Sequence, residues 1–383
     1  MTSERTISIP ELYTDLATRA FASPEGSADR VGIEAEFFLL RHSGAGTDCE
    51  QVGTESREPR LYDWLDLLAA EHGWERGTDA SGTAPEWQIP SGSRITLEPG
   101  GQIEVSSPPC RGVDEALAEI ERIERLTAER ASSDGLLLLA TGYNDRLGRR
   151  SPELVVRKPR YLLMDEHFSE IGRWGKMMMR STCSTQVNLD FGPPDVAMKR
   201  WRLAVYLSQI IGILFSTSGY TWRGESFGNF RREIWRRTDP CRTGVPEGIT
   251  GADPVSAWVD FALDATVIFV DDPISGCHRP THPVTFRQWL SGSDAIAGWP
   301  DLEDWRTHLT TLFPDVRPRG FIEIRTLDAM PPERRSEAVR MLVYALYNDA
   351  HTDELLDIFE NERRPGQDPV LLRRSLSGLL RSA

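Results

Sequence analysis

Residues 31–40 read Val-Gly-Ile-Glu-Ala-Glu-Phe-Phe-Leu-Leu, an apolar run interrupted by two carboxylates. This length and composition are typical of a buried strand. Because side chains alternate across a strand, Glu34 and Glu36 are expected on one face and the intervening Ala35 on the other. Two neighbouring acids beside apolar residues repel each other and lose hydration, so they require protons, cations or a metal ion. A solvated surface is the simpler interpretation of such a pair, and the rest of the chain decides between the two.

The composition indicates a globular protein that does not bind polyanions. Of the 383 residues, 39% are hydrophobic and 27% are charged, and the net charge is -14. Nucleic acid and anionic membranes repel such a protein at long range, so neither is expected as a partner. The longest apolar segment, residues 203–215, is shorter than the roughly 20 residues of a membrane span. The first ten residues show no secretory signal, and a cytoplasmic location is expected.

Further segments repeat the pattern of one polar and one apolar face. Residues 94–98 and 102–106 alternate and are separated by a Pro-Gly-Gly turn, which is a hairpin signal. Residues 182–191 and 320–328 alternate in the same way. Strands that share this pattern predict a curved sheet whose concave face is an active site and whose convex face packs on helices.

The remaining chain predicts helices around this sheet. Residues 42–60, rich in Gly, Thr, Glu and Arg, are expected to form an irregular insertion or mobile loop. Antiparallel hairpins mixed with separate helices favour an α+β fold over a doubly wound parallel fold. No repeat or linker divides the chain, so residues 1–383 are predicted to form a single domain. The segments with helical periodicity are residues 11–21, 61–72, 113–131, 201–217, 332–347 and 353–360.

The residue types on the polar faces indicate magnesium and an anion. Carboxylates are the hard oxygen ligands that suit Mg²⁺, and His and Cys are missing from these strands, which argues against zinc. Residues 231–242 contain five arginines, whose planar groups bind carboxylate or phosphate, although a solvated helix face is the alternative. Neither a P-loop nor a Gly-x-Gly-x-x-Gly motif is present, so a nucleotide would have to bind on the sheet. The candidate metal ligands are Glu34, Glu36, Glu104 and Glu323, together with Glu98.

Five segments in order resemble the motifs of the glutamate-cysteine ligases, and the resemblance is strongest to the plant and actinobacterial branch. That branch includes the enzyme that opens ergothioneine biosynthesis. The segments are residues 32–37, 97–106, 184–190, 230–244 and 321–325.

The resemblance implies a glutamine-synthetase-like catalytic fold in which an antiparallel sheet holds ATP, Mg²⁺ and glutamate. It implies that the five glutamates named above are metal ligands, that Arg231 holds the substrate glutamate and that Arg325 meets the transferring phosphate. Arg231, Arg325 and Glu36 are therefore the expected catalytic residues. The resemblance gives binding roles to Gln186, Asn188 and Arg325 for the nucleotide, and to Arg231, Trp235, Arg242 and Asn188 for glutamate.

The expected activity is ATP-dependent formation of γ-glutamylcysteine from L-glutamate and L-cysteine through a γ-glutamyl phosphate. γ-Glutamylation of a different amine stays open, because acceptor pockets are usually built from loops. Residues 224–228 fit the Gly-x-Ser-x-Gly pattern of serine hydrolases, but the residues before them make a poor strand. A non-catalytic relative would be expected to lose charged strand residues, and all of them are present.

Overall fold

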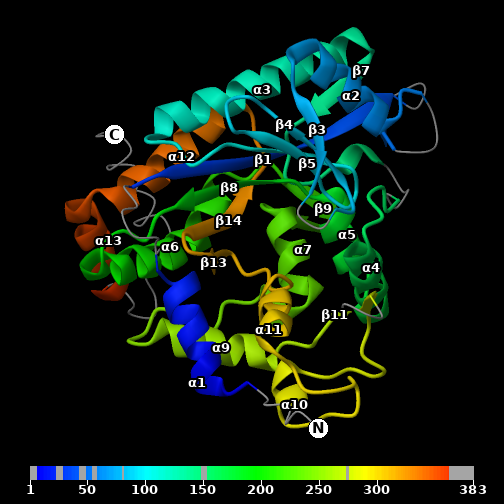
Figure 1. Cartoon of the computed structure of the whole chain (residues 1–383). Helices are drawn as coiled ribbons and strands as arrows, with labels where there is room; N and C mark the ends of the chain where they lie inside the picture. The colour runs from blue at the N-terminus through cyan, green and yellow to red at the C-terminus, as the bar shows by residue number, and fades with distance from the viewer. Residues whose placement is uncertain are drawn as a thin grey trace.

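The computed structural model describes residues 7–22, 29–42, 49–53, 58–79, 82–147, 153–272 and 276–361. Its central element is β1 (Val31–His42), which crosses the molecule in Figure 1. The main sheet has the order β13 (Val316–Pro318), β14 (Ile322–Asp328), β8 (Ser184–Leu189), β1, β6 (Ile103–Ser106), β5 (Arg94–Leu97), β4 (Pro85–Gln88) and β3 (Glu75–Thr78). β2 (Cys49–Gln51) and β7 (Leu136–Leu139) also pair with β1. The pairings that the described residues make in this sheet are antiparallel.

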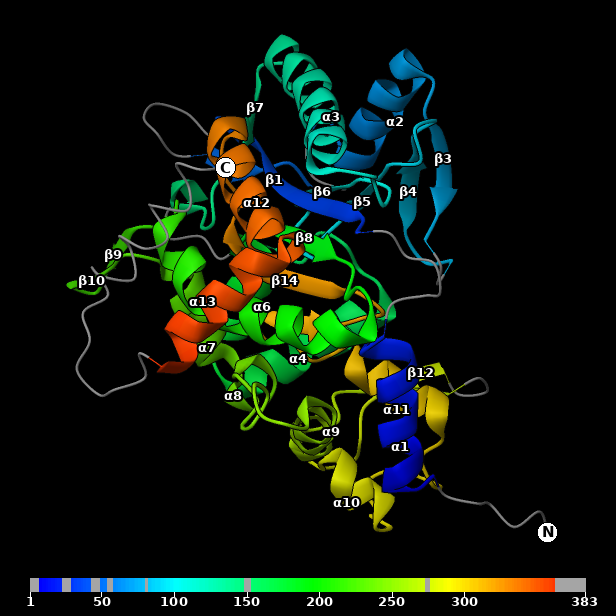
Figure 2. The same ribbon diagram turned by 90° about the vertical axis from the view of Figure 1, so that its left-hand side faces the viewer.

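Helices cover one face of the sheet. They are α2 (Leu61–His72), α3 (Val113–Ser133), α6 (Pro194–Leu214) and α12 (Pro332–Tyr347), followed by α13 (Asp349–Asn361). α3 packs on β1, β6 and β7, while α6 packs on β14. In both views α3 lies on one side of β1, whereas α4 (Pro159–Ile171) and α9 (Pro254–Asp264) lie on the other (Figure 1 and Figure 2).

Shorter elements surround the opposite face. The helical ones are α1 (Ile9–Asp15), a π-helical turn η1 (Leu16–Ala20), η2 (Asp145–Leu147), α5 (Trp174–Ser181), α7 (Phe230–Thr238), α8 (Pro240–Thr243), α10 (Phe286–Leu290) and α11 (Leu302–Leu309). Two small hairpins pair β9 (Tyr220–Trp222) with β10 (Glu225–Phe227), and β11 (Val270–Asp272) with β12 (Gly276–His278).

The two faces of β1 differ as the alternation predicts. Ile33, Ala35 and Phe37 are buried in the large core between the sheet and the helices. Burial of a large side chain such as Phe37 stabilises the fold by roughly 1.5–3 kcal/mol. Glu34 and Glu36 leave the other face, so the strand holds its acids away from this core. The expected α+β fold, with an antiparallel sheet between helices and a polar site, is confirmed.

Several predicted elements are confirmed closely. α2 spans the predicted residues and ends at Gly73, which adopts the left-handed conformation (φ 68°) that favours glycine at a helix end. The Pro-Gly-Gly turn joins β5 to β6 in a hairpin. α12 also has the predicted bounds.

Other predictions need correction. The first helix begins two residues early, at Ile9, and becomes the π-helical turn η1 after Asp15. Within the segment expected to be irregular, Cys49–Gln51 pairs with the end of β1, while residues 43–48 and 54–57 lie outside the described residues. The Gly-x-Ser-x-Gly pattern belongs to the β9–β10 hairpin, where the hydroxyls of Ser226 and Thr221 are 2.9 Å apart. It is not the strand-to-helix turn of a hydrolase nucleophile.

No helix in the described part of the chain is long and apolar enough to cross a membrane.

Candidate active site

Strand register brings the polar residues of neighbouring strands onto one surface. On β1, Glu36 lies opposite Glu104 of β6, and Glu34 lies opposite Gln186 of β8. Thr96 of β5 lies opposite Glu104 in turn. Directly opposite residues in an antiparallel pair share a face. These side chains therefore form one continuous polar surface.

This polar surface is part of the wall of a cavity of about 460 Å³. Residues of η1, α4, α5, α7, α9 and α11 also line the cavity. The expected site residues that line it are Glu34, Glu36, Glu98, Glu104, Gln186, Trp235, Glu323 and Arg325. The structure thus brings all five expected metal ligands to a single cavity.

Hydrogen bonds across the sheet orient three of these carboxylates. The side-chain amide of Asn188 donates to Glu34 at 2.9 Å, and the hydroxyl of Thr96 donates to Glu104 at 2.7 Å. Glu36 is held in the same way by donors of β8. The strands therefore fix the acids in the cavity wall.

Burial and mutual repulsion make this surface costly to ionise. Burial, reinforced by the charge of Glu34, raises the pKa of Glu104 well above its usual value. Burial, reinforced by Glu36, raises the pKa of Glu98 to about 7. Burial and the charge of Glu323 raise the pKa of Glu34 as well. A cation bound beside these acids would therefore favour their ionised form.

Glu323 differs from the other acids because three arginines surround it. Arg317 donates two hydrogen bonds to its carboxylate, one of them at 2.9 Å, and Arg319 donates one at 3.2 Å. Nη1 of Arg325 lies 3.4 Å from Oε2 of the same group. Burial alone would raise the pKa of Glu323, but the charges of Arg317 and Arg325 outweigh burial and lower it far below the usual range.

Arg325 connects this arginine cluster to the carboxylates. Its Nη1 donates to Oε1 of Gln186 at 2.7 Å, and Nε2 of Gln186 donates to Glu36 at 3.2 Å. The guanidinium group also lies over the ring of Trp235, 5.7 Å from its centroid. Nε1 of Trp235 is buried and has no hydrogen-bond partner among the described residues, which leaves one donor beside the cavity unsatisfied.

The order of these residues along the chain agrees with a known family. Residues 30–376 match the model of glutamate-cysteine ligase family 2. The chain belongs to this family. The matched region contains every cavity residue discussed above.

Individual relatives agree with this assignment. Glutamate-cysteine ligase EgtA of Mycolicibacterium smegmatis is 35% identical over 314 residues, which are 80% of this chain and 66% of that protein. The chloroplastic glutamate-cysteine ligase of Arabidopsis thaliana is 31% identical over 325 residues, 82% of this chain and 61% of that protein. The chain therefore spans about two thirds or less of the length of these relatives.

Solved structures are more distant. GmaS without ligand is 10% identical, with a TM-score of 0.37 over 97% of this chain and 69% of that chain. The ligase PafA, in complex with the ubiquitin-like protein Pup, is 12% identical, with a TM-score of 0.36 over 85% of this chain and 47% of that chain. The family assignment rests on the sequence matches alone.

Three residues with expected binding roles are absent from the described cavity wall: Asn188, Arg231 and Arg242. Asn188 contacts the cavity wall indirectly, because its side chain donates to Glu34, which lines the cavity. Arg231 and Arg242 are both buried.

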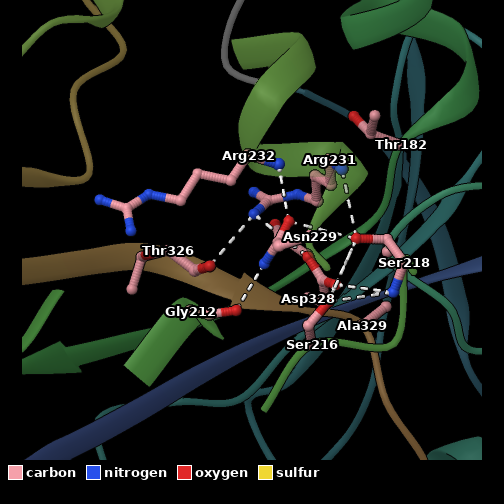
Figure 3. A network of polar contacts seen from close by, with 12 residues as sticks. Thr182, Gly212, Ser216, Ser218, Asn229, Arg231, Arg232, Thr326, Asp328 and Ala329 are labelled. Carbon is pink, nitrogen blue, oxygen red and sulfur yellow. Dashed lines mark hydrogen bonds and ion pairs between the residues drawn. The ribbon is translucent and has the colours of Figure 1, made fainter. Parts of the chain in front are cut away.

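Arg231 lies behind the cavity wall. Its guanidinium group is 5.5 Å from the ring centroid of Trp235, on which Arg325 also packs. Nη1 of Arg231 donates to the carbonyl of Thr326 at 3.3 Å, and Nη2 donates to the carbonyl of Arg325 at 3.0 Å. The buried carboxylate of Asp328 lies 3.9 Å from Nη1 and balances its charge (Figure 3). Arg231 therefore supports the strand that presents Arg325.

Arg242 has a structural environment. It is fully buried, and Nε donates to Asp239 at 2.8 Å. Nη1 donates to the hydroxyl of Thr311 at 2.9 Å, and Nη2 donates to the carbonyl of Thr266. The arginine run that suggested an anion site spans two helices, and its members face different surroundings.

The carboxylates fit Mg²⁺ by their chemistry. Among the described residues, no group of three His, Cys, Asp or Glu side chains is already arranged as a metal site. The reason is visible in the contacts, since Glu34 and Glu104 turn toward neutral side chains and Glu323 toward arginines. Carboxylate oxygens are nevertheless the ligands that Mg²⁺ prefers, and the raised pKa values of Glu98 and Glu104 show that these groups ionise more readily when a cation is beside them.

The sequence interpretation missed several cations of the cavity wall. Arg317 and Arg319 come from β13 and the turn after it, which pair with β14. The alternating Arg-x-Arg before Gly320 was the signal that could have placed them beside Glu323. Arg94 also lines the cavity, two positions before Thr96 on β5, so the period of two could have found it.

Proposed function

We propose that this protein is a ligase that uses ATP and Mg²⁺ to join the γ-carboxylate of L-glutamate to an amine, and that the amine is L-cysteine. The product would be γ-glutamylcysteine. The observation that carries the proposal is a single cavity whose wall contains five buried or half-buried carboxylates together with the guanidinium group of Arg325. The names of the relatives, glutamate-cysteine ligases, support this choice of substrates.

In the proposed reaction an oxygen of the γ-carboxylate attacks the terminal phosphorus of ATP, ADP leaves, and γ-glutamyl phosphate forms. The amine nitrogen then attacks the acyl carbon, the bond from that carbon to the phosphate oxygen breaks, and inorganic phosphate leaves. The nitrogen releases its excess protons to solvent. Both steps bring anions or charge-bearing oxygens together, so positive charge in the cavity is required.

The residues divide into two roles in this proposal. Arg325 meets the transferring phosphate, and its hydrogen bond to Gln186 holds it in place beside Glu36. Trp235 lines the part of the cavity that would hold the substrate glutamate, and Arg231 supports its ring from behind. Fixed positions of this kind supply the orientation part of the rate enhancement.

The same five acids, Glu34, Glu36, Glu98, Glu104 and Glu323, would hold Mg²⁺. Bound there, Mg²⁺ would neutralise the phosphate oxygens of the nucleotide. Asn188 would act by orienting Glu34. Arg242 has no direct role in the proposal, because its buried contacts hold it away from the cavity.

Phosphate release is the direct test. Purified protein is given ATP, Mg²⁺ and L-glutamate, amines are added one at a time, and the product is identified by mass. Cysteine-dependent phosphate release with formation of γ-glutamylcysteine is expected. Turnover with another amine and none with cysteine would reject cysteine but retain the ligase. Failure to consume ATP with any amine would contradict the ligase itself.

The proposal extends to the biological setting. We propose a cytoplasmic enzyme, with residues 1–383 acting as one catalytic domain and small molecules as its partners. We also propose a place in the first step of ergothioneine or other low-molecular-weight thiol synthesis, which the similarity to the EgtA ligases supports.

A further inference from the structure

A segment that precedes the family match contributes to the cavity. The match begins at residue 30, whereas Leu16, Arg19 and Ala20 of η1 line the cavity together with the carboxylates. Motifs of the family therefore do not account for this part of the wall.

The segment is firmly fixed to the rest of the molecule. Leu16 is 1% exposed within the large core, and the ring of Phe21 packs edge-on against Trp201 with centroids 4.8 Å apart. The backbone N–H of Gly320 donates to the carbonyl of Ala20 at 2.8 Å. Because Gly320 lies in the turn before β14, η1 is attached to the strand that carries Glu323 and Arg325.

Two arginines from distant parts of the chain meet at this segment. Asp15, with a side chain only 5% exposed, accepts hydrogen bonds from Nη2 of Arg19 at 3.1 Å and from Nη2 of Arg306 at 2.8 Å. Both arginines line the cavity, and their side chains are 45% and 36% exposed. Asp15 thus orients two guanidinium groups toward one part of the cavity while its single charge balances only one of them.

The local charge at this part of the cavity is positive. Arg319 lines the same cavity, and its side chain is 53% exposed. Among the described residues, the acids in contact with the three arginines are Asp15, Glu303, which is exposed, and Glu323, which is buried and already paired with Arg317. Guanidinium groups with free donors bind carboxylate and phosphate in a forked geometry. A positive surface also attracts anions into a protein of net negative charge.

We propose that Arg19 and Arg306, oriented by Asp15, form an anion-binding site that the segment before the family match adds to the substrate cavity. The ligand is an anionic group of a substrate, either a phosphate of the nucleotide or the carboxylate of an amino acid. This inference rests on the proposed function, because that function supplies both kinds of anion.

The test compares Arg19→Gln, Arg306→Gln and Arg19→Lys with the wild-type chain. Arg125→Gln is the matched control, since Arg125 also pairs with an acid four residues away but is exposed on α3, away from the cavity. KM values are measured for ATP, L-glutamate and the amine, and the dissociation constants of ADP and L-glutamate are measured by calorimetry. Melting temperatures show that each variant is folded.

We expect Arg19→Gln and Arg306→Gln to weaken the binding of one anionic ligand about tenfold with little change in kcat. Arg19→Lys should restore part of the lost affinity. A larger KM for ATP together with weaker ADP binding identifies a phosphate of the nucleotide as the group that the arginines bind. A larger KM for glutamate or for the amine identifies the carboxylate of that substrate as the group that the arginines bind. Values within twofold of the Arg125→Gln control for every ligand overturn the proposal.

The binding measurements distinguish a failure of this inference from a failure of the proposed function. If the wild-type chain consumes no ATP with any amine, the ligase proposal fails, while the dissociation constants still decide whether Arg19 and Arg306 bind an anion. A wild-type chain that binds neither ADP nor glutamate overturns both.

Discussion

Glu36 on β1 accepts two hydrogen bonds from Ser184 on β8, one from the backbone N–H at 2.8 Å and one from the hydroxyl at 2.6 Å. These residues are 148 positions apart in the chain. The pair fixes both oxygens of an acid that is 8% exposed at the cavity. Such a fixed carboxylate suits a role in which its position relative to a cation matters.

Glu36→Gln should abolish most activity while the protein stays folded. The amide keeps the shape of the side chain but removes the charge, so we expect kcat to fall at least about 100-fold with the melting temperature little changed. Steady-state phosphate release and circular dichroism measure the two effects. Glu129→Gln, at an exposed position of α3, is the control. Normal turnover of Glu36→Gln would show that catalysis does not depend on the charge of this residue.

Turnover should depend on a divalent cation held by the sheet acids. Removal of metal with EDTA should abolish phosphate release, and added Mg²⁺ should restore it. Glu104→Gln should raise the Mg²⁺ concentration for half-maximal activity by about tenfold or more, because a ligand is lost. Magnesium titration of both proteins checks this. Activity that persists in EDTA would contradict the metal site.

Arg242→Met should affect stability rather than substrate binding. The substitution leaves the half-buried carboxylate of Asp239 without Arg242, and loss of one partner of a buried pair costs up to about 3–5 kcal/mol. Urea unfolding should show this loss. Below the melting temperature, the KM for glutamate of the folded fraction should match the wild type. A stable variant with a raised KM for glutamate would instead return Arg242 to the substrate site.

The free energy of unfolding should decrease in mild acid because of the buried His308. Burial lowers the pKa of this histidine from 6.5 to about 3, and Nε2 lies 2.8 Å from the carbonyl of Ala262. Between these pKa values the unfolded chain binds a proton that the folded chain does not, so stability decreases as pH falls below about 6.5.

From pH 7.5 to 5.5 this histidine should contribute a loss of about 1.4 kcal/mol in the free energy of unfolding. Urea titrations at the two pH values measure it. His308→Gln should reduce the difference by that amount, while His282→Gln, at a half-exposed position, should leave it unchanged. Equal pH dependence in wild type and His308→Gln would contradict the assignment.

The sequence by itself determined the local features of this protein. The alternation of residues 31–40 separated Glu34 and Glu36 from the core, because a strand has a period of two wherever it is placed. The Pro-Gly-Gly turn and Gly73 marked a hairpin and a helix end, since both depend on the conformations open to a few adjacent residues. The order of the motifs indicated the family.

The tertiary structure decided which of these residues meet. Two arginines of one run, Arg231 and Arg242, became a support behind the cavity and a buried structural cation. Arg19 and Arg306, which are far apart in the sequence, came together on Asp15. Strand register and chain closure bring such groups into contact, and neither is encoded in the spacing of neighbouring residues. Charge alone shows that an arginine needs a partner, whereas the fold decides whether that partner is the protein or a substrate.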